Sequence, residues 1–250
     1  MRRLVCCIAM ACVWLSSPAL RSSAQEWTRF HGPNGTGASE TKSIPAQWTE
    51  DDYNWKVAVP GTGHSSPVVW GEKIFLLSAD TETATRYVVC YHTETGRKLW
   101  QVDYPSKPHH LHQFSSYASC TPCVDGERVY VAWSTPDETL LIALDHEGHE
   151  QWRRDLGRWV SQHGFGTSPM LYQDLVILNN SQQAARLPEG VKPGESFVIA
   201  FDRKTGEDRW RTPRASVNVC YSVPCIYQPD GGEPQLICTN TGDGMFSLDP

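Results

Sequence analysis

Cysteines and histidines are the residues of this chain whose types and spacing suit chemistry. Thiolates and imidazoles bind zinc or copper, and a C-x-x-C pair can also be redox-active. After residue 24 the cysteines are Cys90, Cys120, Cys123, Cys220, Cys225 and Cys238. Cys120 and Cys123 form a C-x-x-C pair, and Cys220 with Cys225 would complete a four-thiolate site.

An internal repeat, described below, argues against that site. Cys123 aligns with Met170 and Cys225, which are ordinary first-strand positions where a small buried cysteine packs well. No helix N-terminus is expected at the pair, although one normally lowers the pKa of a redox cysteine. We therefore expect packing cysteines and no metal site. Disulfide pairing, which export permits, stays open.

The histidines are the second candidates. His109, His110 and His112 lie in a proline-flanked connection between two repeat units, and His64 and His163 each precede the first strand of a unit. Hydrogen-bonded loop histidines are the simpler interpretation. The alternative is a common pocket near the axis that His64 and His163 line.

Neither a calcium site nor a serine nucleophile is favoured by the remaining polar residues. The loop 240–244, with Asp243, offers oxygen ligands but lacks the EF-hand spacing, so a hairpin turn is expected. Ser65, Ser66 and Ser168 are not in a G-x-S-x-G elbow. We expect no catalytic residue, and the sequence identifies no cofactor-binding residue.

A repeat of about fifty residues organises the chain after residue 63. Each unit opens at a proline, reads as four short strands joined by turns, and is expected to end its fourth strand at a tryptophan. No long stretch has helical periodicity. The units are 64–104, 117–159, 163–214 and the incomplete 219–250. This pattern predicts an all-β propeller of four-stranded blades.

The turn before the fourth strand is the most specific feature of the repeat. A glycine lies four residues before each tryptophan, as Gly206 does before Trp210. This fixed spacing lets the indole cover the turn glycine of a neighbouring blade, where any side chain would collide.

The stretch from Ala200 to Trp210 fits the pattern A-x-D-x-x-T-G-x-x-x-W. It resembles the tryptophan-docking motif of pyrroloquinoline quinone (PQQ)-type propellers. Together with residues 27–37 and 61–71, it is similar to exported bacterial PQQ-binding-like repeat proteins. The resemblance implies a propeller fold. Its relatives include dehydrogenases that hold PQQ and Ca²⁺, and a non-catalytic periplasmic scaffold of outer-membrane protein assembly.

The repeats amount to about 3.6 blades, which predicts a fragment of a larger ring, since propellers usually have four to eight. Residues 25–63 form an N-terminal segment in which residues 54–59 look like a ring-closing strand. A four-bladed ring closed by that strand is the alternative.

The first 24 residues have the layout of a secretory signal peptide. Arg2 and Arg3 precede an apolar run over residues 4–15, and small residues end at Ala24. The alternatives are an uncleaved anchor and a lipoprotein signal cut at Cys12. We expect a periplasmic or extracellular chain whose mature part has no transmembrane segment. Its net charge of −6 disfavours nucleic acid as a partner.

These observations predict an exported, non-catalytic repeat protein that binds a protein partner or small ligand on its propeller face. The alternative is an oxidoreductase that uses PQQ and Ca²⁺. Against it, adjacent cysteines occur only at Cys6 and Cys7, and no C-x-x-C-H haem site is present.

Overall fold

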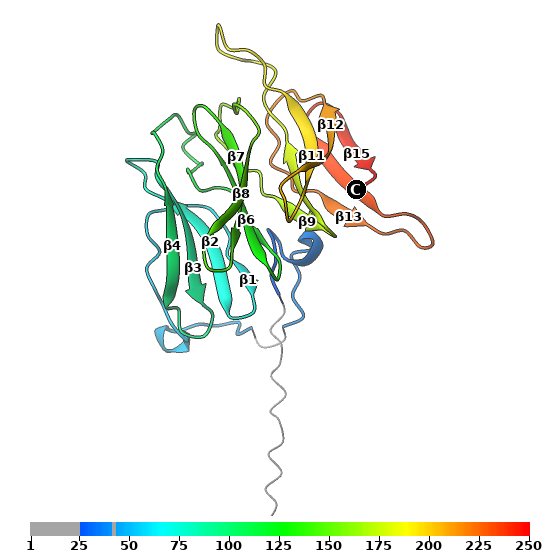
Figure 1. Ribbon diagram of the computed structural model, residues 1–250. Coiled ribbons are helices and arrows are strands. Elements are labelled where there is room, and N and C mark those ends of the chain that lie inside the picture. Colours follow the sequence, from blue (N-terminus) through cyan, green and yellow to red (C-terminus); the bar gives the residue numbers. More distant parts are fainter. Residues whose placement is uncertain (1–25, 42–43) are drawn as a thin grey trace, which may run out of the picture.

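The computed structural model describes residues 26–41 and 44–250, so the predicted signal peptide lies outside the described residues. Four antiparallel sheets fan out side by side in chain order (Figure 1). The first strands of neighbouring sheets contact each other, β1 with β5 and β5 with β9. This arrangement confirms the all-β propeller prediction.

The strands have the following bounds. The first sheet holds β1 (Val68–Trp70), β2 (Lys73–Ala79), β3 (Arg86–His92) and β4 (Lys98–Tyr104). The second holds β5 (Cys123–Val124), β6 (Arg128–Ser134), β7 (Thr139–Asp145) and β8 (Glu150–Asp155). The third holds β9 (Met170–Tyr172), β10 (Leu175–Asn180), β11 (Ser196–Asp202) and β12 (Asp208–Arg214). The fourth holds β13 (Cys225–Tyr227), β14 (Gln235–Asn240) and β15 (Gly244–Leu248), and the short helices are η1 (Pro33–Gly35) and η2 (Glu50–Asp52).

The core lies between the sheets. In the second sheet, β6 and β7 are buried along nearly their whole length because a neighbouring sheet covers each face. Their sequences are therefore almost continuously apolar. The outer strands β8 and β12 keep exposed positions with a period of about two, as expected for strands at the rim.

The contact between tryptophan and glycine forms as predicted. A Cβ added to Gly206 would come within 2.7 Å of the Trp152 indole, and one added to Gly148 within 3.0 Å of Trp100. Each indole also donates a hydrogen bond from Nε1 to a carbonyl of the same turn. The Trp152 bond to Arg203 is 3.1 Å long. The indole thus fixes both the spacing and the angle of neighbouring sheets.

The prediction that the fourth strand ends at the tryptophan is wrong. Trp100 is the third residue of β4, which continues to Tyr104. A bulge beside Cys90 shifts the register, so that Cys90 pairs with Trp100 while Tyr91 pairs with Lys98. Beyond the tryptophan, residues 101–104 continue the strand because they pair with residues 86–89 of β3.

Residues 54–59, which look like a ring-closing strand in the sequence, are not assigned to a strand. Trp55 nevertheless covers Gly96, where an added Cβ would lie 2.5 Å from the indole. Its Nε1 donates to the Thr93 carbonyl over 2.7 Å. The N-terminal segment thus supplies to the first sheet the tryptophan that a preceding blade would supply. Ring closure stays a prediction.

The start of the described chain crosses the first strands of all four sheets, which the sequence did not indicate. Trp27 pairs with Val69 of β1, and the Thr28 carbonyl accepts from the Val124 N–H of β5. Arg29 contacts Met170 of β9, and Asn34 bonds both backbone groups of Ile226 in β13. We call residues 26–37 the clasp segment.

We predict that Gly206→Ala destabilises the protein more than Gly190→Ala. Both glycines have positive φ, +73° and +77°, but nothing lies within 4 Å of the site of a Gly190 Cβ. Gly190→Ala should therefore cost only the backbone strain, about 1 kcal/mol. Gly206→Ala should lose about 1–3 kcal/mol more of the free energy of unfolding, because its methyl group would overlap with the indole. Chemical denaturation measures both, and equal losses would refute the docking contact as the cause.

Candidate binding site at the loop face

Four connections lie at the end of the axis where the first strands begin. We call them the loop face, and they are residues 60–67, 105–122, 156–169 and 215–224. Hydrogen bonds join them in sequence around the axis. The His64 N–H donates to the Ala118 carbonyl over 3.0 Å, and the Thr121 N–H donates to the Ser168 hydroxyl over 2.9 Å. Tyr221 completes the series by donating to the Gly164 carbonyl over 3.0 Å.

A pocket of about 430 Å³ opens at this face beside the first sheet. Its lining mixes polar and apolar side chains, contains no Asp, Glu, Lys or Arg, and includes His64, His109, Leu111, Ser116 and Tyr117. The structure therefore pairs His64 with His109. His163 instead meets the edge of His112, with ring centroids 4.9 Å apart. The alternative in which His64 and His163 line one common pocket is therefore wrong.

His109 is held in a defined orientation. Its Nδ1 lies 3.0 Å from the Lys107 carbonyl, and because a carbonyl only accepts, Nδ1 carries the proton and Nε2 remains an acceptor. The Tyr117 hydroxyl donates to the His109 carbonyl over 2.9 Å and accepts the His109 N–H over 3.0 Å. The two rings are 4.8 Å apart.

A buried arginine, Arg86, packs against Tyr117, the partner of His109. Arg86 packs its guanidinium 5.4 Å from the centre of the Tyr117 ring and donates to the carbonyls of Ala84 and Ser134. Burial lowers the pKa of Arg86 to about 10, which leaves it charged at neutral pH. Burial also lowers the pKa of His109, and the Arg86 charge lowers it further. His109 is therefore a neutral hydrogen-bond acceptor at neutral pH.

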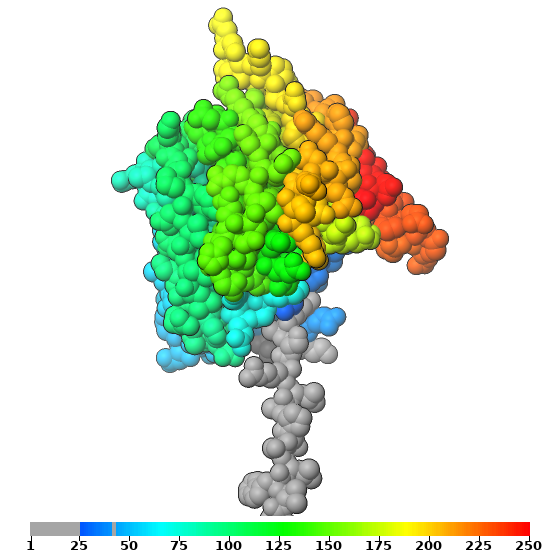
Figure 2. Space-filling model, in the orientation of Figure 1, coloured from blue at the N-terminus to red at the C-terminus, as the bar shows by residue number. Residues whose placement is uncertain are grey.

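A second pocket of 290 Å³ lies beside the third sheet, between residues 156–169 and the long β10–β11 connection, residues 181–195. Trp159, Val160 and Leu187 give it an apolar lining, and His110 is at its edge. Two buried glutamines form hydrogen bonds between the two segments that line it. Gln182 accepts from the Val160 N–H over 2.7 Å, and Gln183 accepts from the Gln162 N–H over 2.9 Å. The long connection projects from the molecule (Figure 2).

The donor set of the loop face does not fit Ca²⁺ with a quinone. Ca²⁺ needs six to eight oxygens, usually including carboxylates, but the four connections contain no Asp or Glu. No group of three or more His, Cys, Asp or Glu that could hold a metal occurs within residues 26–41 and 44–250. Asp243 lies in the turn between β14 and β15, where the Asn240 Oδ1 accepts two backbone N–H bonds.

The cysteines of the predicted C-x-x-C pair are packed in the core. Cys120 and Cys123 are almost fully buried, and all six cysteines after residue 26 are free thiols. Burial raises the pKa of Cys120 to about 12 and that of Cys123 well above its ordinary value. Both are therefore protonated and unreactive at neutral pH, as expected for packing residues.

We predict that His109→Gln reduces the loss of stability on acidification. The folded pKa of His109 is lowered from 6.5, so the unfolded state binds the proton first and wild type loses stability as pH falls below about 6.5. The variant lacks this contribution and should lose less between pH 7 and pH 5. Denaturation at several pH values measures how the free energy of unfolding depends on pH. His110→Gln is the control, because His110 is exposed. An unchanged pH slope in His109→Gln would contradict the assignment.

Three solved structures are similar to this chain, and the first of them supports the fold with a TM-score above 0.5. A europium-containing methanol dehydrogenase superposes with a TM-score of 0.53 at 19% identity, covering 77% of this chain and 32% of that one. A quinohemoprotein alcohol dehydrogenase, ADHIIG from Pseudomonas putida HK5, gives 0.49 at 17% identity, covering 73% and 32%. BamB from Moraxella catarrhalis gives 0.37 at 13% identity, covering 78% and 66%.

This chain therefore spans about a third of the length of the two dehydrogenases. No curated protein sequence matches it. Over residues 84–222, more than half of the chain, the sequence matches the family described as outer membrane protein assembly factor BamB. The match confirms the resemblance to PQQ-type repeat proteins that the docking motif indicates. The chain belongs to this family of β-propellers.

Proposed function

We propose that the chain is an exported, non-catalytic propeller that binds a protein partner through the loop face. One observation carries the proposal: the four connections of the loop face expose apolar side chains and contain no acidic residue. Phe114 is 78% exposed, and Val217 and Tyr221 are also exposed. Exposed apolar groups gathered on one face are typical of protein-binding surfaces.

The charge of the loop face indicates the chemistry of the partner. The chain carries 28 acidic residues, yet none lies in the four connections, where Lys107 and Arg158 are the charged side chains. A partner with an acidic rim around an apolar contact would be attracted to Lys107 and Arg158 on these connections. Complementarity of this kind increases both the rate and the selectivity of association.

The residues that distinguish the repeat have structural roles, which favours binding over catalysis. The recurring contact between indole and glycine serves packing, as at Trp152 and Gly206. The family description, an assembly factor, points the same way. Export rests on the signal-like residues 1–24, and no helix in the described part of the chain is long and apolar enough to cross a membrane.

The oxidoreductase alternative gains no specific support from the site. A quinone with Ca²⁺ calls for carboxylate ligands that the connections around the axis lack. Titration of PQQ with Ca²⁺ into the purified chain should therefore give no saturable heat. Micromolar binding would instead favour the oxidoreductase.

We predict that a photo-crosslinker placed at Phe114 captures a protein partner in the cell that exports the chain. The same group at Tyr227 is the control, because Tyr227 is 55% exposed but lies where β13 ends, away from the loop face. The adduct at position 114 should be lost when Lys107 and Arg158 are both changed to Glu, since the charges would then repel the partner. Equal adducts at both positions, or an adduct that survives the charge reversal, would refute the proposal.

A further inference from the structure

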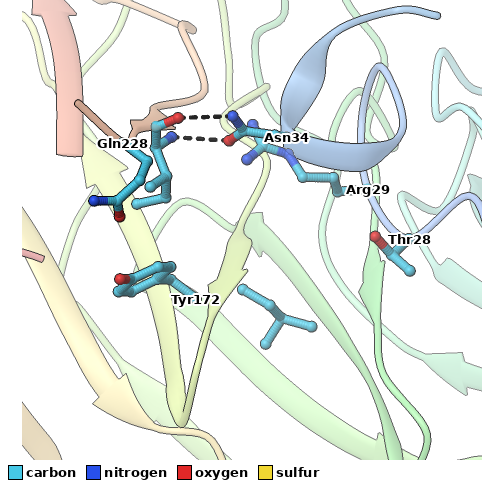
Figure 3. A pocket seen from close by; sticks show the side chains of 7 residues that line it. Thr28, Arg29, Asn34, Tyr172 and Gln228 are labelled. Atoms are coloured by element: carbon cyan, nitrogen blue, oxygen red, sulfur yellow. Dashed lines mark hydrogen bonds between the residues drawn. The ribbon is translucent and has the colours of Figure 1, made fainter. Parts of the chain in front are cut away.

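A pocket of 380 Å³ lies at the opposite end of the axis, between the clasp segment and the ends of β9 and β13. Its lining includes Arg29, Asn34, Leu171, Tyr172, Ile226 and Gln228. Figure 3 shows the side chains that line this space, with the two hydrogen bonds between Asn34 and Ile226 at its edge. The bonds are 2.7 and 2.8 Å long and hold the clasp segment on β13.

Arg29 supplies the charge of this pocket. It is only 5% exposed, and its Nη2 donates to the Pro224 carbonyl over 2.8 Å. Its Nη1 lies 3.6 Å from the Met170 sulfur, a weak acceptor, and its Nε is buried without a hydrogen-bond partner. Among the described residues, no carboxylate forms an ion pair with Arg29.

The groups around Arg29 do not neutralise it. Cys123 is a neighbour, but burial raises its pKa well above the ordinary value, so it remains a neutral thiol. The Asp125 carboxylate is already bonded to Arg203 over 2.6 Å and to Tyr130 over 3.0 Å. Burial lowers the pKa of Arg29, yet a guanidinium stays charged in proteins. A buried cation without an anion is costly.

The guanidinium is also held in place before any ligand arrives. A Cβ added to Gly35 would lie 3.2 Å from the Arg29 Nη2, so the η1 turn passes closely over the guanidinium. Asn34, the preceding residue, is fixed by its two bonds to Ile226. A charge fixed in this way loses little conformational entropy when it binds a ligand.

We propose that this pocket binds a small organic carboxylate, with the carboxylate on Arg29 and the apolar body against Leu171, Tyr172 and Ile226. Carboxylates match the planar guanidinium, and the apolar wall selects acids with an aromatic or branched body over inorganic anions. The volume is near the lower end for ligand pockets, which suits a small molecule. This site is separate from the loop face and does not depend on the function proposed for it.

The test is a titration of the purified chain with the probe 4-fluorobenzoate, whose binding is measured by ¹⁹F NMR. Wild type should bind it saturably, and 4-fluorobenzamide, which lacks the charge, at least about tenfold more weakly. Arg29→Met should weaken binding of the acid by at least about tenfold. The control Arg97→Met removes an exposed arginine in the turn between β3 and β4 and should leave binding unchanged.

Arg29 also braces the clasp segment, so thermal unfolding is measured for each variant. If Arg29→Met does not fold, Leu171→Phe is the second variant, because it fills the pocket and keeps the charge. It should weaken binding of the acid by at least about tenfold in a folded protein. The proposal is overturned if wild type shows no saturable binding, if the acid and the amide bind equally, or if the folded pocket variant binds as wild type does.

Discussion

The contact between a tryptophan indole and the turn glycine of the next sheet is the interaction on which this structure depends. It sets the distance between sheets, because a Cβ at Gly206 would lie 2.7 Å from Trp152. It also sets their angle through the Nε1 bond to the Arg203 carbonyl. The apolar faces of β6, β7, β10 and β11 are buried only because neighbouring sheets are held at this spacing and angle.

The two ends of the axis differ in chemistry because the first strand of every sheet runs in the same direction. Where these strands begin, the connections bring together histidines and exposed aromatic side chains such as Phe114. Where they end, the clasp segment brings a fixed positive charge, Arg29, against apolar strand residues. One repeat architecture therefore offers a broad face suited to a macromolecule and a narrow pocket suited to a small anion.

The sequence predicted the features that depend on local spacing. The apolar strands, the Asp and Gly turns and the tryptophan contacts recur within each unit, so the propeller could be inferred from them. The sequence did not predict the contacts of the clasp segment, since Asn34 and Ile226 are 192 residues apart and no periodicity links them. The bulge beside Cys90 and the partner of His64 depend on three-dimensional packing and were also missed.

The separation between Asn34 and Ile226 also has a consequence for how the chain folds. Loop-closure entropy must be overcome before so distant a contact can contribute, so the clasp should form late and slow the final step. Synthesis releases the clasp segment first and β13 nearly two hundred residues later. During that interval Asn34 lacks its partner Ile226, and the end of the clasp segment is not held in place. A holding chaperone that binds the nascent chain over this window would protect it from aggregation.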